Sequence, residues 1–535
     1  MRRTALNQQG RERDLTTQLK SVGGILGEFA EYVKIHPLFA LITAAVVAVC
    51  YAKQAFSLNF YIDAEVIINN PGTFYNWLDI GRFGLVFLKL LLGLSWYNPY
   101  FEAGLFLVAL WGMSLSAGYL FSRLDRRINS TVAGIFSLLI VVYPNYADQF
   151  LFRYQALEIV LGIWLLLLGN MWFVLWLQEK NQPAFALSLI PLVISFGVYQ
   201  SMVNIQLAFY LGMFLFWLYV KGEDGRAVRR GIWGSAVHFG LAFIIHEVLV
   251  QLFFSNSDYL SSQIRWGEIG LWGGIRTVFG YGLDILFGDG VFGTVSYAVG
   301  LALLAAVVVL LLWKKRSRAV WYVCGAVGLA SSPFFLCILM GSRTVVRVQL
   351  TLPFVCGMMW FFGCHVIVQL VQEAGKLQLA GYVLGLGVLL GAVLLYQQAF
   401  LLMRLFYTED VVRRSDMITA TRIIADIEDI QSVHEGKPVV FIGHRVGLRN
   451  GSSLENTGES YLLQSAFEYD YLFEPQYYFS THRILGFFKT LGYSYNMPSR
   501  EMTVQAYEYS EGMVCWPLPG AVQEFDDFIL VKLSN

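Results

Sequence analysis

Pro37-Leu-Phe-Ala-Leu-Ile-Thr-Ala-Ala-Val-Val-Ala-Val-Cys-Tyr-Ala-Lys-Gln-Ala55 is the first long apolar stretch of the chain, and Tyr61-Ile-Asp63-Ala-Glu65-Val66 follows it closely. A run of this length can just span a bilayer as a helix. Carboxylates beside such a helix are costly to dehydrate, so we expect them to face a wet or charge-compensated cavity at the membrane surface. Acidic pairs are also common in solvated loops. We interpret this pair as part of a catalytic pocket at the outer membrane face.

The composition is that of an integral membrane protein. Of 535 residues, 56% are hydrophobic and 14% are charged, against about 25% charged in ordinary soluble domains. Lys plus Arg and Asp plus Glu balance at 38 each, so no global charge points to nucleic acid. Five of the six cysteines fall inside apolar runs and none has metal-ligand spacing, so we expect neither a disulfide framework nor a zinc site.

The pattern of apolar runs predicts a polytopic α-helical membrane protein with about eleven transmembrane helices. Residues 1–36 are rich in Arg and Lys, which places the N-terminus in the cytoplasm. A cleaved signal peptide is the alternative, and it leaves Asp63 outside as well. The predicted spans are residues 37–55, 100–121, 129–144, 155–177, 184–200, 203–220, 232–254, 294–313, 319–340, 350–371 and 379–402.

Charged loops test this arrangement. Basic clusters at residues 123–127, 221–230 and 314–318 fall in loops that the alternation places inside. The loops near Asp63, Tyr199 and Arg343 then share the outer side. We expect residues 37–402 to form the transmembrane domain, with a first outer loop at 58–99, an outer surface helix from Gly81 to Trp96 and an interfacial aromatic segment at 255–293. Residues 403–535 are more polar and predict an extracytoplasmic α/β domain, with strands near 437–443 and 528–533.

Several outer residues are suited to transferring a sugar from a lipid phosphate. That reaction needs a base for the acceptor hydroxyl and cations for the departing phosphate. Asp63 and Glu65 are the candidate bases. Arg343 and Arg347, on one face if that segment is helical, are candidates for the phosphate, and Arg82 is a weaker one. Snorkelling to the outer headgroups is the alternative role for such arginines.

Other polar residues are predicted to border the same pocket. Glu247 lies in an apolar run near its outer end, where it either faces the cavity or is satisfied by His246 or another neighbour. Asp79, Tyr199 and Gln200 complete the candidate acceptor or pocket residues. We predict no dedicated metal ligand set, although a divalent metal remains an option for the acidic pair.

The layout and short motifs resemble the bacterial Gtr-type O-antigen glucosyltransferases of the GT-C superfamily. The resemblance rests on Asp63 and Glu65, on Gly81-Arg82, on Tyr199-Gln200-Ser201, and on Lys437-Pro-Val-Val-Phe-Ile-Gly443. It implies inverting transfer of a hexose, with glucose as the expected sugar, from undecaprenyl phosphate to a cell-surface polysaccharide outside the bacterial cytoplasmic membrane. The implied partners are a small flippase and a synthase that makes the lipid-linked sugar. The Asp-Ala-Glu spacing leaves open which carboxylate is the base.

Two other functions fit a polytopic protein of this kind. A transporter or flippase of lipid-linked oligosaccharide would place ionisable residues near the membrane midplane and often show inverted repeats. An O-antigen polymerase or ligase would also use lipid-linked sugars and outward-facing arginines. The acidic pair at one face and the absence of a visible repeat favour the monosaccharide transferase.

Overall fold

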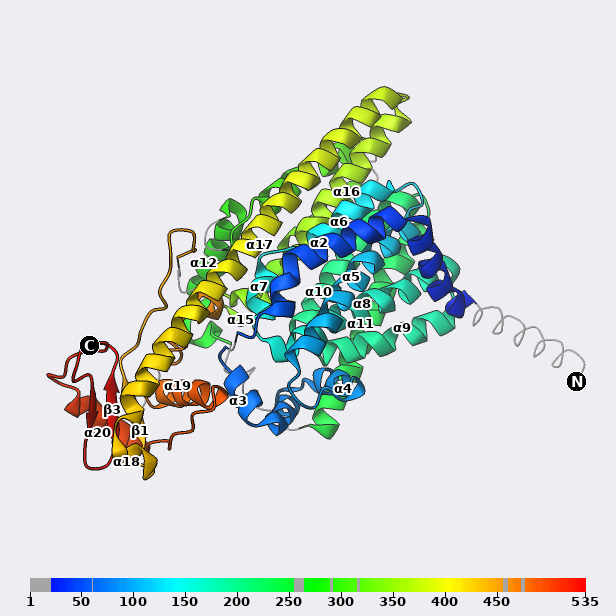
Figure 1. The fold of residues 1–535 in the computed structure, drawn as a ribbon. Coiled ribbons are helices and arrows are strands. Elements are labelled where there is room, and N and C mark those ends of the chain that lie inside the picture. Colours follow the sequence, from blue (N-terminus) through cyan, green and yellow to red (C-terminus); the bar gives the residue numbers. More distant parts are fainter. Residues whose placement is uncertain are drawn as a thin grey trace, which may run out of the picture.

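The computed structural model describes residues 21–59, 61–254, 264–288, 292–314, 318–455, 460–472 and 477–535. A bundle of apolar helices carries a smaller mixed region at one end (Figure 1). The bundle helices are α2 (Pro37–Phe56), α5 (Pro99–Leu124), α6 (Ser130–Val141), α8 (Arg153–Glu179), α9 (Gln182–Phe196), α10 (Ser201–Lys221), α11 (Gly225–Phe253), α13 (Ser296–Lys314), α14 (Ala319–Ser331), α15 (Phe335–Met340), α16 (Leu352–Glu373) and α17 (Leu377–Glu428).

The remaining elements complete the fold. Those inserted between the bundle helices are α3 (Ala64–Asn69), η1 (Pro71–Ile80), α4 (Phe83–Leu91), α7 (Asn145–Phe150), α12 (Trp266–Phe287), η4 (Ser332–Phe334) and η5 (Val346–Val348). Those after α17 are α18 (Gln431–His434), β1 (Val439–Ile442), η6 (Tyr461–Leu463), α19 (Tyr478–Thr490), α20 (Arg500–Tyr509), β2 (Val522–Glu524) and β3 (Ile529–Lys532).

The helical membrane character of the chain is confirmed, whereas the number of spans is not. In the described residues, 8 helices are long and apolar enough to cross a membrane, and a bent pair, Ser21–Ile35 and Pro37–Lys53, would make a ninth. Every predicted span contains helix, but α6 and α9 have only 12 and 15 residues. At 1.5 Å per residue they are about 18 and 22 Å long, less than the hydrocarbon core of about 30 Å.

The three basic loops gather at one end of the bundle, which we call the basic end. Arg318 pairs with Glu223 at 2.9 Å, and the Arg127 guanidinium lies 5.5 Å from the centre of the Tyr219 ring. Tyr219 and Lys314 both approach Glu373, at 3.4 and 3.9 Å. The described parts of the loops that the positive-inside rule groups together are therefore neighbours in space. Lys315 and Arg316 lie outside the described residues.

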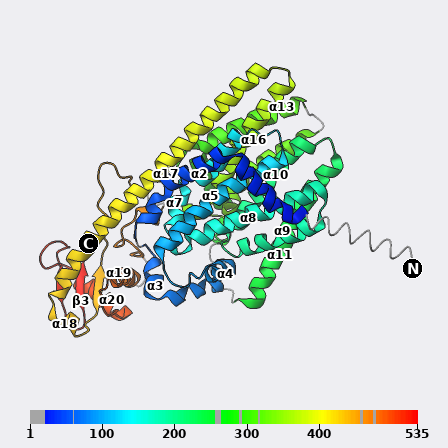
Figure 2. The ribbon, with the colours of Figure 1, turned by 45° about the vertical axis from the view of Figure 1, so that its right-hand side comes forward.

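The opposite end, which we call the site end, carries the acidic motif and the C-terminal region (Figures 1 and 2). Here α3 lies beside α19, and η5 lies against α7. Helix α17 runs without interruption for 52 residues from the basic end into the C-terminal region, through the position 402/403 at which the sequence places a domain boundary. This continuous helix links the bundle to the elements that follow it.

A three-stranded sheet organises the C-terminal region. The strand order is β1-β3-β2, with β1 parallel and β2 antiparallel to β3. Side chains alternate between the two faces of a strand, and Val440 and Ile442 of β1 cluster with Ala506 of α20. On the other face, the Phe441 ring lies 5.7 Å from that of Phe488 in α19. The predicted strands near 437–443 and 528–533 are confirmed as β1 and β3.

Two segments that were predicted to lie on the outer side have contrasting surroundings. Helix α4 does not simply lie on the surface, because Gly84 donates its N–H to Gly197 O at 2.7 Å and so packs α4 tightly against the end of α9. Lys89 of α4 is buried and pairs with Glu158 at 3.0 Å. The aromatic segment 255–293 contains helix α12, on which Trp272 and Phe279 are exposed, as expected at an interface. Residues 255–263 and 289–291 lie outside the described part.

Candidate active site

The acidic motif surrounds an arginine that comes from the far end of the chain. Arg483 of α19 lies 3.0 Å from Asp63, 2.7 Å from Glu65 and 2.9 Å from Asp470. Its guanidinium therefore meets three carboxylates, two of them from the predicted motif. Such charge-assisted hydrogen bonds are shorter and stronger than neutral ones. The structure thus brings Asp63 and Glu65 together on a shared cation.

Local backbone geometry aims these acids at Arg483. Asp63 and Asp470 both have left-handed backbones, with φ of 71° and 55°, a region that aspartate tolerates better than most residues. Arg483 is fixed from the other side, because Phe441 N–H of β1 donates to Thr481 Oγ1 in α19 at 3.0 Å. Left-handed residues other than glycine often mark functional sites. The two ends of the cluster are therefore positioned by different parts of the fold.

A glycine permits α19 to approach the motif. A side chain at Gly486 would place its Cβ 2.8 Å from Cγ of Glu65, closer than Cβ atoms normally come to other atoms. Asn69 of α3 also donates to Gly486 O at 3.0 Å. The missing side chain therefore lets α3 and α19 pack closely enough for Arg483 to reach Glu65.

The two motif carboxylates differ in environment. The Asp63 side chain is 49% exposed, whereas that of Glu65 is 5% exposed. Burial raises the pKa of Glu65 to about 7, against the opposing effect of Arg483. Burial lowers the pKa of the Arg483 guanidinium, but the Glu65 and Asp63 charges outweigh it and raise that pKa above its usual value. Asp63 is the more accessible acid, and Glu65 is the one that titrates near neutrality.

Arg347 lies in an aromatic setting close to this cluster. Its guanidinium is 5.2 Å from the centre of the Phe152 ring and 5.3 Å from that of Tyr461. Burial raises the pKa of Tyr461, which also feels the charges of Arg347 and Asp63. Within the described chain, no carboxylate pairs with Arg347, so its charge is available to an anion.

Arg82 forms a second cationic position. It lies 4.5 Å above the Tyr199 ring and donates to Gln200 Oε1 at 3.3 Å and to Gln155 Oε1 at 3.4 Å. Gln200 in turn donates to Ile80 O at 3.2 Å. The structure therefore unites three predicted pocket residues, Arg82, Tyr199 and Gln200, in one contact group.

Tyr154 links the two cationic positions to the acidic motif. Its ring stacks on Trp77 at 5.5 Å, and it lies within range of the charges of Asp63, Glu65, Arg82 and Arg347. Neither Tyr154 nor Arg483 was singled out by the sequence. Tyr154 adjoins Arg153, which instead donates to Lys53 O at 3.4 Å and to Ser57 O and so ties α8 to the end of α2.

The remaining predicted residues lie elsewhere. Arg343 and Arg347 do not share a helical face, because only Val346–Val348 forms a single 3-10 turn between extended residues. Arg343 pairs with Asp284 of α12 at 2.7 Å. Glu247 contacts its neighbour His246 at 3.2 Å, as the local alternative predicted. Asp79 is exposed in η1.

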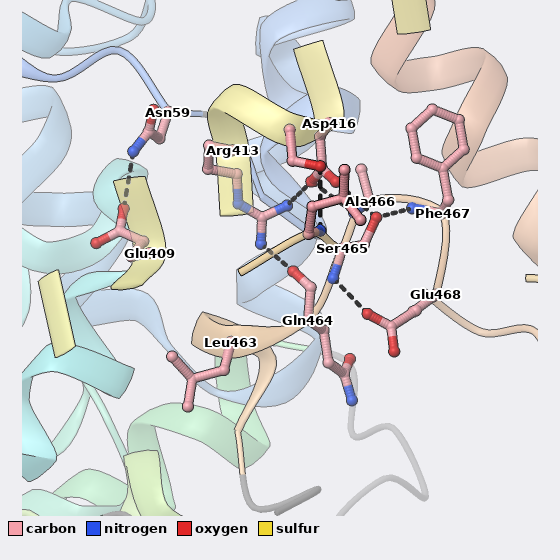
Figure 3. Close-up of polar contacts among 12 residues, drawn as sticks. Asn59, Glu409, Arg413, Asp416, Leu463, Gln464, Ser465, Ala466, Phe467 and Glu468 are labelled. Atoms are coloured by element: carbon pink, nitrogen blue, oxygen red, sulfur yellow. Dashed lines mark hydrogen bonds and ion pairs between the residues drawn. The ribbon is translucent and has the colours of Figure 1, made fainter. Parts of the chain in front are cut away.

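A buried ion pair on α17 holds the loop that carries Asp470. Arg413 donates to Asp416 at 2.8 Å and to Gln464 O at 2.6 Å, while Asp416 accepts from Ser465 Oγ at 2.6 Å (Figure 3). The Arg413 guanidinium also lies 4.3 Å from the centre of the Tyr61 ring, two residues before Asp63. The Arg413–Asp416 pair on α17 therefore contacts both the segment before Asp63 and the loop that carries Asp470.

Within the part of the chain that the structure describes, no group of three or more His, Cys, Asp or Glu side chains is arranged to hold an ion. Asp63, Glu65 and Asp470 are each within 3.0 Å of the Arg483 guanidinium. That guanidinium occupies the centre of the three carboxylates and supplies their countercharge. The donor set is therefore already engaged by a cation of the chain itself.

A sequence model of the glucosyl transferase GtrII family matches residues 53–363, which is more than half of the chain. The chain belongs to this family. The match includes Asp63, Glu65, Arg82 and Arg347 but ends well before Arg483. The match supports a membrane glucosyltransferase that acts on cell-surface glycans. No curated protein and no solved structure matches the chain.

Proposed function

We propose that this glucosyltransferase takes glucose from undecaprenyl phosphate glucose and transfers it, with inversion, to a cell-surface polysaccharide such as O-antigen. The single observation that supports this best is the convergence of Asp63 and Glu65 with cations from three other segments at one end of the bundle. A base beside cations is the minimal set for sugar transfer from a lipid phosphate. The fold would be that of the GT-C superfamily.

The donor phosphate binds between Arg347 and Arg82 in this proposal. Both guanidiniums lie near Tyr154, and Arg347 has no carboxylate partner in the described residues. As the bond from C1 of glucose to the phosphate oxygen breaks, negative charge grows on the departing phosphate, and the two cations stabilise it. Arg343 is engaged by Asp284 and contributes less.

The acceptor hydroxyl loses its proton to a motif carboxylate as its oxygen attacks C1 from the face opposite the phosphate. Asp63 is the accessible candidate, and Glu65 is the candidate that exchanges a proton near pH 7. Arg483 pairs with both acids and supplies a positive charge beside them. The proton passes from the acceptor hydroxyl to the carboxylate, so no further group is needed to take it up.

The site end faces outward across the bacterial cytoplasmic membrane in this proposal, because the basic end carries the positive loops. The N-terminus is then cytoplasmic and the C-terminal region extracytoplasmic. A flippase must deliver the donor to that side, and a cytoplasmic synthase must make it. The lipid-linked donor then reaches the site by lateral diffusion in the membrane.

Paired variants test the carboxylate role. Asp63→Asn and Glu65→Gln keep shape and hydrogen bonding while removing the basic oxygen, and loss of a positioned base costs about 10²–10⁴-fold in rate. We expect one of them to lose glucose transfer by that factor with the Michaelis constant for the donor little changed. Near-normal transfer by both variants would refute the catalytic role of this motif.

A further inference from the structure

A groove between α3 and α19 opens beside the acidic motif. Its volume is about 260 Å³, and its lining includes Glu65, Asn69, His482, Leu485, Lys489 and Ser494. On α19 the lining positions 482, 485, 486 and 489 recur at helical spacing and so form one stripe. On α3 they are 65, 66 and 69. The groove therefore runs along both helices and reaches the carboxylates at one end.

The charges of the groove differ from those around Tyr154. Glu65 pairs with Arg483 at 2.7 Å, and Lys489 is exposed on the last turn of α19. Burial lowers the pKa of His482, which keeps its imidazole neutral at neutral pH. Among the lining residues no pair of guanidiniums is available for a phosphate. With one exposed ammonium and no guanidinium, the lining lacks the paired cations that hold a phosphate at Arg82 and Arg347.

The lining combines hydrogen-bonding and apolar groups. Asn69, His482 and Ser494 can donate and accept, while Val66, Leu485 and Met497 offer apolar surface. Sugar rings present hydroxyl groups at their edges and C–H groups on their faces, which such a mixed lining can bind. The volume is near the lower end of ordinary ligand pockets and is too small and too polar for an isoprenoid chain.

We propose that this groove binds the acceptor, as a short segment of largely uncharged polysaccharide whose receiving hydroxyl points toward the Asp63 and Glu65 end. The proposal rests on the proposed transferase function and adds the side from which the acceptor enters. Donor phosphate and acceptor then reach the carboxylates from different directions, the donor from Arg82 and Arg347 and the acceptor from α19. The α19 wall lies beyond the family match at 53–363, so acceptor recognition involves the C-terminal region.

Two activities of the full-length protein in liposomes separate acceptor binding from catalysis. The first is glucose transfer from undecaprenyl phosphate glucose to surface polysaccharide purified from a strain that lacks the enzyme. The second is slow release of glucose to water when polysaccharide is omitted. Ser494→Trp fills the groove from an exposed position, and His482→Ala removes a hydrogen-bonding group. Gln505→Trp, exposed on α20 outside the groove, is the matched control.

We expect the Michaelis constant for polysaccharide to rise about 3- to 10-fold in His482→Ala, the loss expected for one hydrogen bond, and further in Ser494→Trp. Glucose release to water should stay within about twofold of the unmodified protein. An unchanged constant for polysaccharide in both variants, or equal loss of both activities in both, would overturn the groove assignment. Failure of the unmodified protein in both assays would instead overturn the proposed function.

Discussion

Replacing Arg483 by glutamine removes the cation that three carboxylates share. The structure allows the contributions to be ranked. The Asp63 side chain is 49% exposed, so its ion pair counts for little after solvent screening. Glu65 and Asp470 are 5% and 14% exposed, and breaking a buried pair by removing one partner costs about 3–5 kcal/mol. Most of the effect should therefore appear at Glu65.

The expected consequence is a shift in the pH dependence of activity. Because burial raises the pKa of Glu65 from 4.5 to about 7, stability from its protonated form is present below its unfolded pKa and is lost as the pH rises through about 7. Arg483 opposes that rise. Without Arg483, Glu65 keeps its proton to higher pH. The acid limb of the kcat/KM profile should therefore move to higher pH.

The measurement is glucose transfer by the full-length protein in liposomes between about pH 5 and pH 9, the range in which such a limb is visible. Arg483→Lys keeps the positive charge but lacks the planar fork, so its acid limb should lie between those of the unmodified protein and Arg483→Gln. Arg500→Gln, which removes an exposed cation from α20, should leave the profile unchanged. An acid limb that stays in place in Arg483→Gln would refute the reasoning.

Three further perturbations follow from the contacts. Arg347→Lys should raise the Michaelis constant for the lipid-linked donor about tenfold, because an ammonium lacks the bidentate fork, while Arg343→Ala should have little effect; equal effects would contradict the assignment. Asp416→Asn should lower the thermal unfolding midpoint of the protein because it leaves a buried guanidinium without its counterion, and Asp410→Asn, in an exposed pair, should change it little. A reporter fused after Asn535 should be active outside the cytoplasm, and cytoplasmic activity would reverse the proposed topology.

Local patterns in the sequence predicted the elements of this fold well. Long apolar runs became helices, and the short apolar runs at 439–442 and 529–532 became strands that are buried at every position, as a short apolar run bounded by turn residues predicts. The span count was less predictable. Helices α6 and α9 are apolar but short. Hydropathy reports the composition of a segment and not the length of the helix that forms there, so both were counted as full spans.

The site was predictable only where its residues are neighbours in sequence. Asp63 and Glu65 were recognised as a pair, as were Tyr199 and Gln200, yet the arginine that meets the acids lies 418 positions after Glu65. Nothing near Arg483 in the sequence distinguishes it from other basic residues. A contact that depends on the path of α17 and on the sheet that positions α19 leaves no local signal.

The position of Arg483 changes how the acidic motif is understood. The family match contains the carboxylates but ends at residue 363, while their countercharge comes from α19 and their loop is fixed by Arg413 on α17. The pKa of Glu65 is raised by burial and lowered by the Arg483 charge, so the C-terminal region contributes to it. Any movement of α19 relative to α3 would alter the Arg483–Glu65 pair and the width of the groove together, because both lie between these two helices. If α19 binds the acceptor as proposed, the same helix both contacts the acceptor and carries the countercharge of the carboxylates.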